Sequence, residues 1–157
     1  MSVTKQDRTP LAVVPHVELK RYLGKWYEIA RLPARFQKGC TDTTATYTLA
    51  ADGNISVLNE CRRNGKVRRV KGKAKVVDQT LGAKLKVSFF WPFYADYWII
   101  DLGPDYEYAV VGTPNRRNLW ILSRTPQMDD TLLAQLIESV KAKGFDVTQL
   151  IKTSHQG

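Results

Sequence analysis

Few residues in this sequence could form a catalytic or metal-binding site. The only two histidines, His16 and His155, lie near opposite ends of the 157-residue chain, so a histidine-based triad is not expected. The only two cysteines, Cys40 and Cys61, are too few for a metal framework and permit one disulfide. The sequence therefore predicts no catalytic residue, no metal ligand and no cofactor, and it indicates that the protein is not an enzyme.

The acidic residue Glu28 falls inside the largely apolar stretch "GKWYEIAR" at 24–31. A carboxylate taken out of water normally needs a hydrogen-bonding or ionic partner. We therefore expect Glu28 to be paired inside the protein. Contact with a ligand or an ordered water is a second interpretation, and a role as general base is a third.

Most of the excess positive charge lies in one stretch. The chain has 24 Lys and Arg against 15 Asp and Glu, and eight of these cations fall at 62–75 ("RRNGKVRRVKGKAK") without an acid. Cations alternate there with apolar or small residues, which is typical of a half-buried strand with a solvated outer face. Such a row would also attract anionic lipid headgroups or another polyanion, and the two interpretations are compatible. The cations of the expected outer face are Arg69, Lys71, Lys73 and Lys75.

Alternating segments separated by turn sequences recur from Trp26 to Arg124, as in an antiparallel sheet that meanders by hairpins. Asp52-Gly53 and Asn64-Gly65 are strong hairpin signals. A sheet of about eight strands can close into a barrel without free edges. We therefore predict an all-β fold, an eight-stranded antiparallel up-and-down β-barrel, with strands at about 24–33, 42–50, 54–62, 67–78, 83–90, 95–102, 106–113 and 118–124.

The period changes to that of an α-helix in "MDDTLLAQLIESVKAKG", residues 128–144. Asp129 and Asp130 at its start and Gly144 at its end are typical of helix ends. Because the apolar stripe of this helix must be buried, we expect it to pack on the outside of the barrel. Length and composition predict one soluble domain over 1–157, with poorly ordered ends outside a core at about 16–152.

Three short motifs fall at the ends of these strands: a GxW sequence at the start of the first, an Asp-Tyr pair near the seventh, and an arginine after the eighth. With the three motifs in this order, the sequence resembles the lipocalin family over nearly the whole domain. The resemblance is to bacterial lipocalins in particular, and to their apolipoprotein D and plant temperature-induced relatives. Pro104 stands where the second motif of the family has a threonine. The motif residues are Gly24, Trp26, Asp105, Tyr106 and Arg124.

The resemblance implies a cup-shaped barrel that binds, stores or transports a small hydrophobic ligand. In this branch the ligand is commonly a fatty acid or lysophospholipid, and a part in cell-envelope lipid maintenance follows from it. It also implies a closed barrel floor. There Trp26 is the plug, Gly24 allows a close approach of the chain, and Arg124 lies across the indole ring.

Alternation identifies the residues expected inside the barrel. Since Lys84 and Lys86 must face water, Leu85, Val87 and Phe89 turn inward. Similar reasoning with the family pattern places inside Trp26, Glu28, Ala30, Ala45, Tyr47, Val57, Asn59, Tyr97, Ile99, Trp120 and Leu122. The predicted ligand-binding residues, which include two from the segment described next, are Tyr47, Val87, Phe89, Phe93, Tyr94, Tyr97, Ile99 and Trp120.

The aromatic segment "WPFYAD" at 91–96 is expected to be a loop between the fifth and sixth strands. One interpretation is a lid that packs on the rim of the barrel. In the other, Phe93 lines the pocket and Tyr94 offers its hydroxyl to a polar headgroup at the mouth. Phe36, in the long first loop, is a further candidate for the rim.

A disulfide between Cys40 and Cys61 is expected, with a bend before the second strand to bring the two residues together. Such a bond would indicate an oxidising compartment, whereas free cysteines would leave a cytoplasmic location open. Residues 1–5 do not have the pattern of a signal peptide, so either the protein stays inside the cell or a targeting segment preceded Met1. The expected location is the bacterial periplasm or outer membrane.

The competing interpretation is a small basic β-barrel that binds nucleic acid or another polyanion. Against it, the aromatic residues do not interleave with the basic stretch, and the strand count exceeds that of a five-stranded oligonucleotide-binding barrel. We therefore expect a small hydrophobic ligand and peripheral contact with an anionic membrane surface, but no nucleic acid. The protein itself is expected to be a monomer or a weak homodimer.

Overall fold

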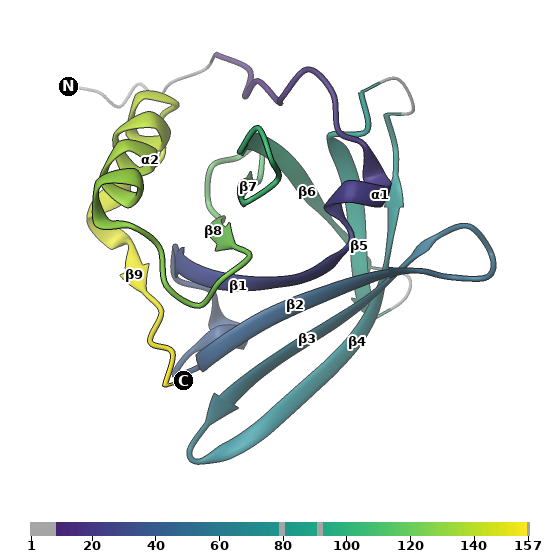
Figure 1. Ribbon diagram of the computed structural model, residues 1–157, viewed down its shortest axis with the longest axis horizontal. Helices are drawn as coiled ribbons and strands as arrows, with labels where there is room; N and C mark the ends of the chain where they lie inside the picture. Colours follow the sequence, from purple (N-terminus) through teal and green to yellow (C-terminus); the bar gives the residue numbers. More distant parts are fainter. Residues whose placement is uncertain (1–8, 79–80, 91–92, 157) are drawn as a thin grey trace.

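The computed structural model describes residues 9–78, 81–90 and 93–156 and shows an eight-stranded antiparallel β-barrel with a helix beside it (Figure 1). Strands β1 to β8 pair in chain order, and β1 pairs with both β2 and β8, so the sheet closes on itself. The predicted fold class is confirmed. The strands are β1 (Gly24–Arg31), β2 (Thr41–Leu49), β3 (Ile55–Arg63), β4 (Lys66–Val76), β5 (Lys84–Phe90), β6 (Phe93–Leu102), β7 (Tyr108–Gly112), β8 (Leu119–Ser123) and a short β9 (Ile151–Lys152).

Successive connections in this topology lie alternately at the two ends of the barrel. We call the end at which β1 begins the floor and the opposite end the mouth. The β2–β3, β4–β5 and β6–β7 connections are at the floor, and the β1–β2, β3–β4, β5–β6 and β7–β8 connections are at the mouth. Both predicted hairpins are present, and Gly53 and Gly65 adopt the positive φ angles of 86° and 76° that their turns require.

A β-bulge in β1 changes which of its residues face inward. Glu28 pairs with Leu122, but the register then shifts so that Ala30 pairs with Ile121 and Arg31 with Trp120. Because one extra residue reverses the alternation, Arg31 turns inward and Ala30 packs outside the barrel under the helix. The prediction that Ala30 faces the interior is therefore wrong.

The helix α2 (Asp130–Ala142) lies against the outer wall of the barrel, as predicted (Figure 1). Asp129 caps its first turn, where its carboxylate accepts a hydrogen bond from the backbone N–H of Leu132 at 3.1 Å. Leu133, Leu136 and Val140 form the buried stripe of the helix. None of the helices in the described ranges is long and apolar enough to cross a membrane.

Both ends of the described chain are packed against the barrel. Leu11 is buried, and the backbone N–H of Val14 donates to the carbonyl oxygen of Ile99. At the other end β9 pairs with β1, and Thr153 is buried. The short helices that complete the fold are α1 (Leu19–Tyr22), η1 (Arg35–Gln37) and η2 (Val147–Gln149).

Within the segment at 91–96, residues 93–96 are strand and not part of a loop as predicted, because β6 already begins at Phe93. Phe93 pairs with Phe90 across a register shift that follows Val87. The aromatic side chains of this segment are therefore held on alternate faces of a strand. Trp91, the other aromatic residue in it, lies outside the described residues.

Candidate ligand-binding site

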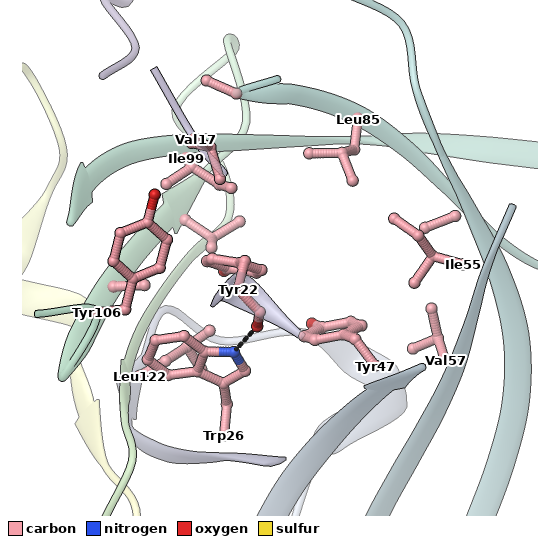
Figure 2. Packing of buried hydrophobic residues seen from close by; sticks show 14 residues of the cluster. Val17, Tyr22, Trp26, Tyr47, Ile55, Val57, Leu85, Ile99, Tyr106 and Leu122 are labelled. Carbon is pink, nitrogen blue, oxygen red and sulfur yellow. Dashed lines mark hydrogen bonds between the residues drawn. The ribbon is translucent and has the colours of Figure 1, made fainter. Parts of the chain in front are cut away.

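Trp26 and Arg124 close the floor of the barrel. Trp26 is fully buried, and its indole N–H donates to the carbonyl oxygen of Tyr22 at 2.9 Å (Figure 2). The guanidinium of Arg124 lies 3.7 Å from the centre of the indole ring and donates to four backbone carbonyl oxygens. At Gly24, where φ is +105°, a Cβ atom would lie 3.3 Å from Arg124 Nη1. These contacts are the ones expected from the sequence.

Tyr106 of the second motif joins the floor to α1. Its hydroxyl accepts a hydrogen bond from the backbone N–H of Glu18 at 2.8 Å, and the guanidinium of Arg21 lies 4.2 Å above its ring. Asp105 is exposed, and its backbone N–H donates to the carboxylate of Glu107. The motif thus stabilises the closed end of the barrel.

Side chains nearly fill the interior just above the floor. Figure 2 shows the rings of Tyr22, Trp26 and Tyr47 close together, with aliphatic side chains around them. The remaining cavity has a volume of about 10 Å³, which is at the lower limit for one water molecule. Four predicted ligand-binding residues are among those that line it: Tyr47, Val87, Tyr97 and Ile99.

Three tyrosine hydroxyls meet beside this cavity. The hydroxyls of Tyr22 and Tyr97 are 2.7 Å apart, and that of Tyr97 also interacts with the hydroxyl of Tyr47. Burial raises the pKa of Tyr47 to about 12, and burial is also the main reason why the pKa values of Tyr22 and Tyr97 lie well above their usual 10.0. The cluster is therefore neutral and strongly disfavours negative charge.

Toward the mouth, residues on the inward face become exposed. Val57 is 3% exposed, whereas Val70, which faces inward on the neighbouring strand, is 50% exposed. Phe89 is 38% exposed, and its ring covers Gly72, where a Cβ atom would lie 2.6 Å from a ring carbon. The upper interior is thus open to solvent, and its wall combines the apolar Val70 and Phe89 with the polar Asn59 and Arg68, which have the same inward parity as Val70.

Two further phenylalanines stand at the mouth. Phe93 is on the inward face of β6 by alternation with Ala95 and Tyr97, and it is 68% exposed. Phe36, on η1, is 66% exposed. Their positions fit residues of the rim more closely than residues of an enclosed pocket.

Tyr94 lies on the outer face of β6. The ammonium of Lys75 is 4.7 Å from the centre of its ring, and the outward neighbour Asp96 pairs with Lys86 at 3.0 Å. Tyr94 does not line the interior cavity. It borders a groove in the outer surface, together with Asn54, Lys71, Gly72, Lys73, Ser88 and Phe89.

Trp120 joins a buried polar network near the mouth. Its indole N–H donates to the side-chain oxygen of Gln37 at 2.9 Å, and the amide of Gln37 donates to Glu28 at 2.8 Å. Arg31 donates to the other carboxylate oxygen of Glu28, also at 2.8 Å, and so does the hydroxyl of Thr153. Glu28 therefore has the ionic and hydrogen-bonding partners that the sequence predicted it to need.

Cys40 and Cys61 form the predicted disulfide, with their Cα atoms 5.5 Å apart. The predicted bend is a register shift in β2. Thr41 pairs with Arg62, whereas Thr44, three residues later, pairs with Glu60, only two residues earlier on β3. The bond fixes the end of the β1–β2 connection to β3.

The outer face of β4 is a solvated row of cations, as predicted. Two of them are paired: Arg69 with Glu60 at 2.7 Å, and Lys73 with Asp52 at 3.7 Å. Among the described residues, no group of three His, Cys, Asp or Glu side chains is placed to hold a metal ion.

The sequence did not identify Tyr22 or Gln37 as part of the interior. Tyr22 precedes the first predicted strand and ends the short helix α1, whereas Trp26 lies in β1, so no single period links the two residues. Gln37 lies in the irregular β1–β2 connection, where no strand or helix periodicity indicates which residues are buried. Nothing in the sequence pattern indicates that Thr153 reaches Glu28, because that contact joins residues 125 positions apart.

The comparisons with known proteins agree with this geometry. The family model described as a lipocalin-like domain matches residues 17–155. The chain belongs to the lipocalin family. It is 44% identical to temperature-induced lipocalin-1 of Arabidopsis thaliana over 94% of this chain and 84% of that protein. It is also 44% identical to the outer membrane lipoprotein Blc of Vibrio cholerae, over 91% of this chain and 85% of that protein.

A more distant relative and a solved structure are also similar to this chain. Apolipoprotein D of Mus musculus is 38% identical over 90% of this chain and 78% of that protein. Insecticyanin of the tobacco hornworm Manduca sexta superimposes with a TM-score of 0.78 at 18% identity, over 96% of this chain and 87% of that chain. At this identity the match to insecticyanin shows the fold alone.

Proposed function

We propose that this lipocalin is a binding protein for one single-chain amphiphile, a fatty acid or a lysophospholipid. The observation that supports it most is a barrel closed by Trp26 and Arg124 at one end, with apolar inward residues open to solvent at the other. Burial of an acyl chain on such walls is favourable by about 25 cal/mol per Å². Selectivity among chains should accordingly be loose.

In this proposal the acyl chain lies in the upper interior, because the space above the floor is nearly filled. Tyr47, Tyr97 and Ile99 form the bottom of the site, and Val87, Phe89 and Trp120 form its walls. Phe93 lies at the rim. The small cavity and the exposed fractions of Val70 and Phe89 support this placement.

The polar end of the ligand is proposed to lie in the outer groove beside Tyr94. That groove is lined by Lys71 and Lys73, of which Lys73 also pairs with Asp52, and Phe89 and Gly72 border both the groove and the interior. Cations and a phenol hydroxyl suit a phosphate or carboxylate headgroup. Tyr94 thus keeps a headgroup role, but on the outer wall.

The test is displacement of a fluorescent fatty-acid probe by unlabelled fatty acid and lysophospholipid. Trp120→Ala should weaken probe binding by about tenfold, since a large aromatic wall is lost. Trp98→Ala is the matched control, because Trp98 lies on the outer face, where Lys84 stacks on its ring at 4.3 Å. Equal binding by the parent and the Trp120 variant would count against this site.

A second pair of measurements tests the headgroup position. Tyr94→Phe should weaken lysophospholipid more than free fatty acid, because only the hydroxyl is removed. Equal effects on the two ligands would remove Tyr94 from the headgroup role.

We also propose a location in the cell envelope, where such a protein would serve lipid maintenance. The Blc relatives are described as outer membrane lipoproteins, and the disulfide suits an oxidising compartment. Thiol alkylation in intact cells tests this. Cys40 and Cys61 should resist alkylation until reductant is added, and rapid alkylation would favour the cytoplasm instead.

A further inference from the structure

The two ends of the barrel carry opposite charges in their strand connections. At the floor, the segments 50–54, 77–83 and 103–107 contain four acidic residues and no Lys or Arg. At the mouth, the connections 32–40 and 113–118 contain two cations each and no acidic residue, and the adjoining ends of β3 and β4 add Arg62, Arg63 and Lys66. The net charge of +9 is therefore unevenly placed along the barrel axis, although Glu18, Lys20, Arg21 and Arg124 also lie at the floor.

Several mouth cations are available to a partner. Arg35, Lys38, Lys66 and Arg117 are exposed and form no ion pair among the described residues. Three other mouth cations are engaged: Arg116 donates to the carbonyl oxygens of Thr9 and Lys143, Arg63 donates to that of Lys38, and Arg62 lies 4.0 Å from Asp42. The four exposed cations come from the β1–β2, β3–β4 and β7–β8 sides of the mouth.

Exposed apolar side chains stand among these cations. Phe36 and Phe93 are 66% and 68% exposed, and Val67 is 45% exposed. Phe36 lies between Arg35 and Lys38 in sequence, and Val67 follows Lys66. A surface that combines apolar side chains with unpaired cations is typical of proteins that bind at a membrane interface.

We propose that the mouth of this barrel docks on the surface of an anionic lipid bilayer. The phenylalanine rings and Val67 enter the headgroup layer, and the cations pair with lipid phosphates. In this orientation the open interior faces the lipid. The docking does not depend on the proposed ligand, whereas its use for lipid exchange rests on the proposed function.

The outer face of β4 is a weaker candidate for the same contact. Arg69 and Lys73 are already paired with acids, and Lys75 lies over the ring of Tyr94. Nucleic acid would also meet these cations, and the rings of Phe36 and Phe93 could stack on bases, but the aliphatic Val67 offers no flat face for stacking. An anionic bilayer offers phosphates to the cations and an apolar layer to the exposed apolar side chains.

Co-sedimentation with vesicles tests the proposal on the ligand-free protein. We expect binding to vesicles of phosphatidylcholine mixed with phosphatidylglycerol, little binding to phosphatidylcholine alone, and weaker binding as NaCl is raised. The triple variant Lys38→Gln, Lys66→Gln, Arg117→Gln should lose about fivefold in affinity for each cation removed. Phe36→Ser should also weaken binding, and all four positions are exposed, so folding should be unaffected.

The matched control removes the same charge from the side of the barrel: Lys71→Gln, Lys73→Gln, Lys75→Gln. Retained vesicle binding by this variant, with loss in the mouth variant, supports docking by the mouth. The reverse result would overturn it in favour of the β4 face. Binding of single-stranded DNA without vesicle binding would overturn it in favour of nucleic acid. Probe displacement measured without vesicles reports separately on the proposed function.

Discussion

Glu28 shows how one buried charge can organise several parts of the chain. Its carboxylate accepts hydrogen bonds from Arg31, Gln37 and Thr153, which belong to β1, η1 and the C-terminal segment. The ion pair is almost fully buried, with side-chain exposures of 4% and 2%. Such a pair is more informative about the arrangement of these segments than about net stability.

Glu28→Gln should lower the free energy of unfolding by about 3 kcal/mol, because Arg31 would remain buried without a counter-charge. Urea denaturation followed by tryptophan fluorescence measures the change. Glu60→Gln is the control, since its pair with Arg69 is largely exposed and its loss should cost at most about 1 kcal/mol. Similar losses in both variants would show that burial of the Glu28 pair has no special effect.

The tyrosine cluster predicts a loss of stability in alkaline solution. A raised pKa in the folded state means that the fold favours the neutral phenol. Its contribution is complete below the unfolded pKa of about 10. For Tyr47 it is lost as pH rises from there through about 12. Thermal unfolding across this range should show a falling midpoint, and the fall should be smaller in Tyr47→Phe. A midpoint independent of pH would contradict the prediction.

At the scale of elements, the disulfide replaces regular pairing where β2 bends. Cys40 and Cys61 are 21 positions apart, and between them β2 and β3 are already paired. A cross-link of this span restricts the unfolded chain, which is the usual account of how disulfides stabilise a protein.

The double variant Cys40→Ser, Cys61→Ser should still form the barrel but unfold with a free energy lower by about 3 kcal/mol. Guanidinium denaturation measures it, and reductant should destabilise the parent by a similar amount. Reductant should leave the double variant unchanged. An unaltered denaturation midpoint in the variant would mean that the bond does not stabilise the fold.

The eight barrel strands and α2 could be predicted from the sequence because their periods of two and 3.6 residues are local. The reversal of inward and outward faces at the β1 bulge could not be predicted. The residues around Ile29 continue the alternating pattern of the sequence and give no sign of an extra residue. The turn-like Pro92 and the aromatic run around it led to a predicted loop where β6 begins. The contacts of Thr153 and Leu11 are tertiary, and no local period reports them.

The prediction of the site was uneven for the same reason. Tyr47, Val87, Tyr97 and Ile99 follow strand alternation, and they do line the interior cavity. Tyr94 was expected in a loop at the mouth, and as part of β6 it faces the opposite side of the sheet from Tyr97. The alternation of a strand assigns each residue to one side of the sheet, but a loop has no such alternation. The sequence therefore could not predict on which side of the barrel wall the hydroxyl of Tyr94 lies.

At the scale of the whole molecule, we propose that residues 9–156 form a single folding unit. The sheet is continuous, and both chain ends pack against it. Far-ultraviolet circular dichroism and the fluorescence of Trp26 and the other tryptophans should therefore report one coincident unfolding transition in urea. Two separated transitions would contradict the single-domain assignment.

The closed floor also has a consequence for the kinetics of ligand transfer. A ligand that enters a barrel with one opening must leave through that opening, so uptake and release share one barrier. If the mouth rests on a bilayer, that barrier is crossed without passage through water. Transfer from loaded protein to acceptor vesicles should then be second order, with a rate that rises in proportion to vesicle concentration. Release into water would instead give a rate independent of vesicle concentration.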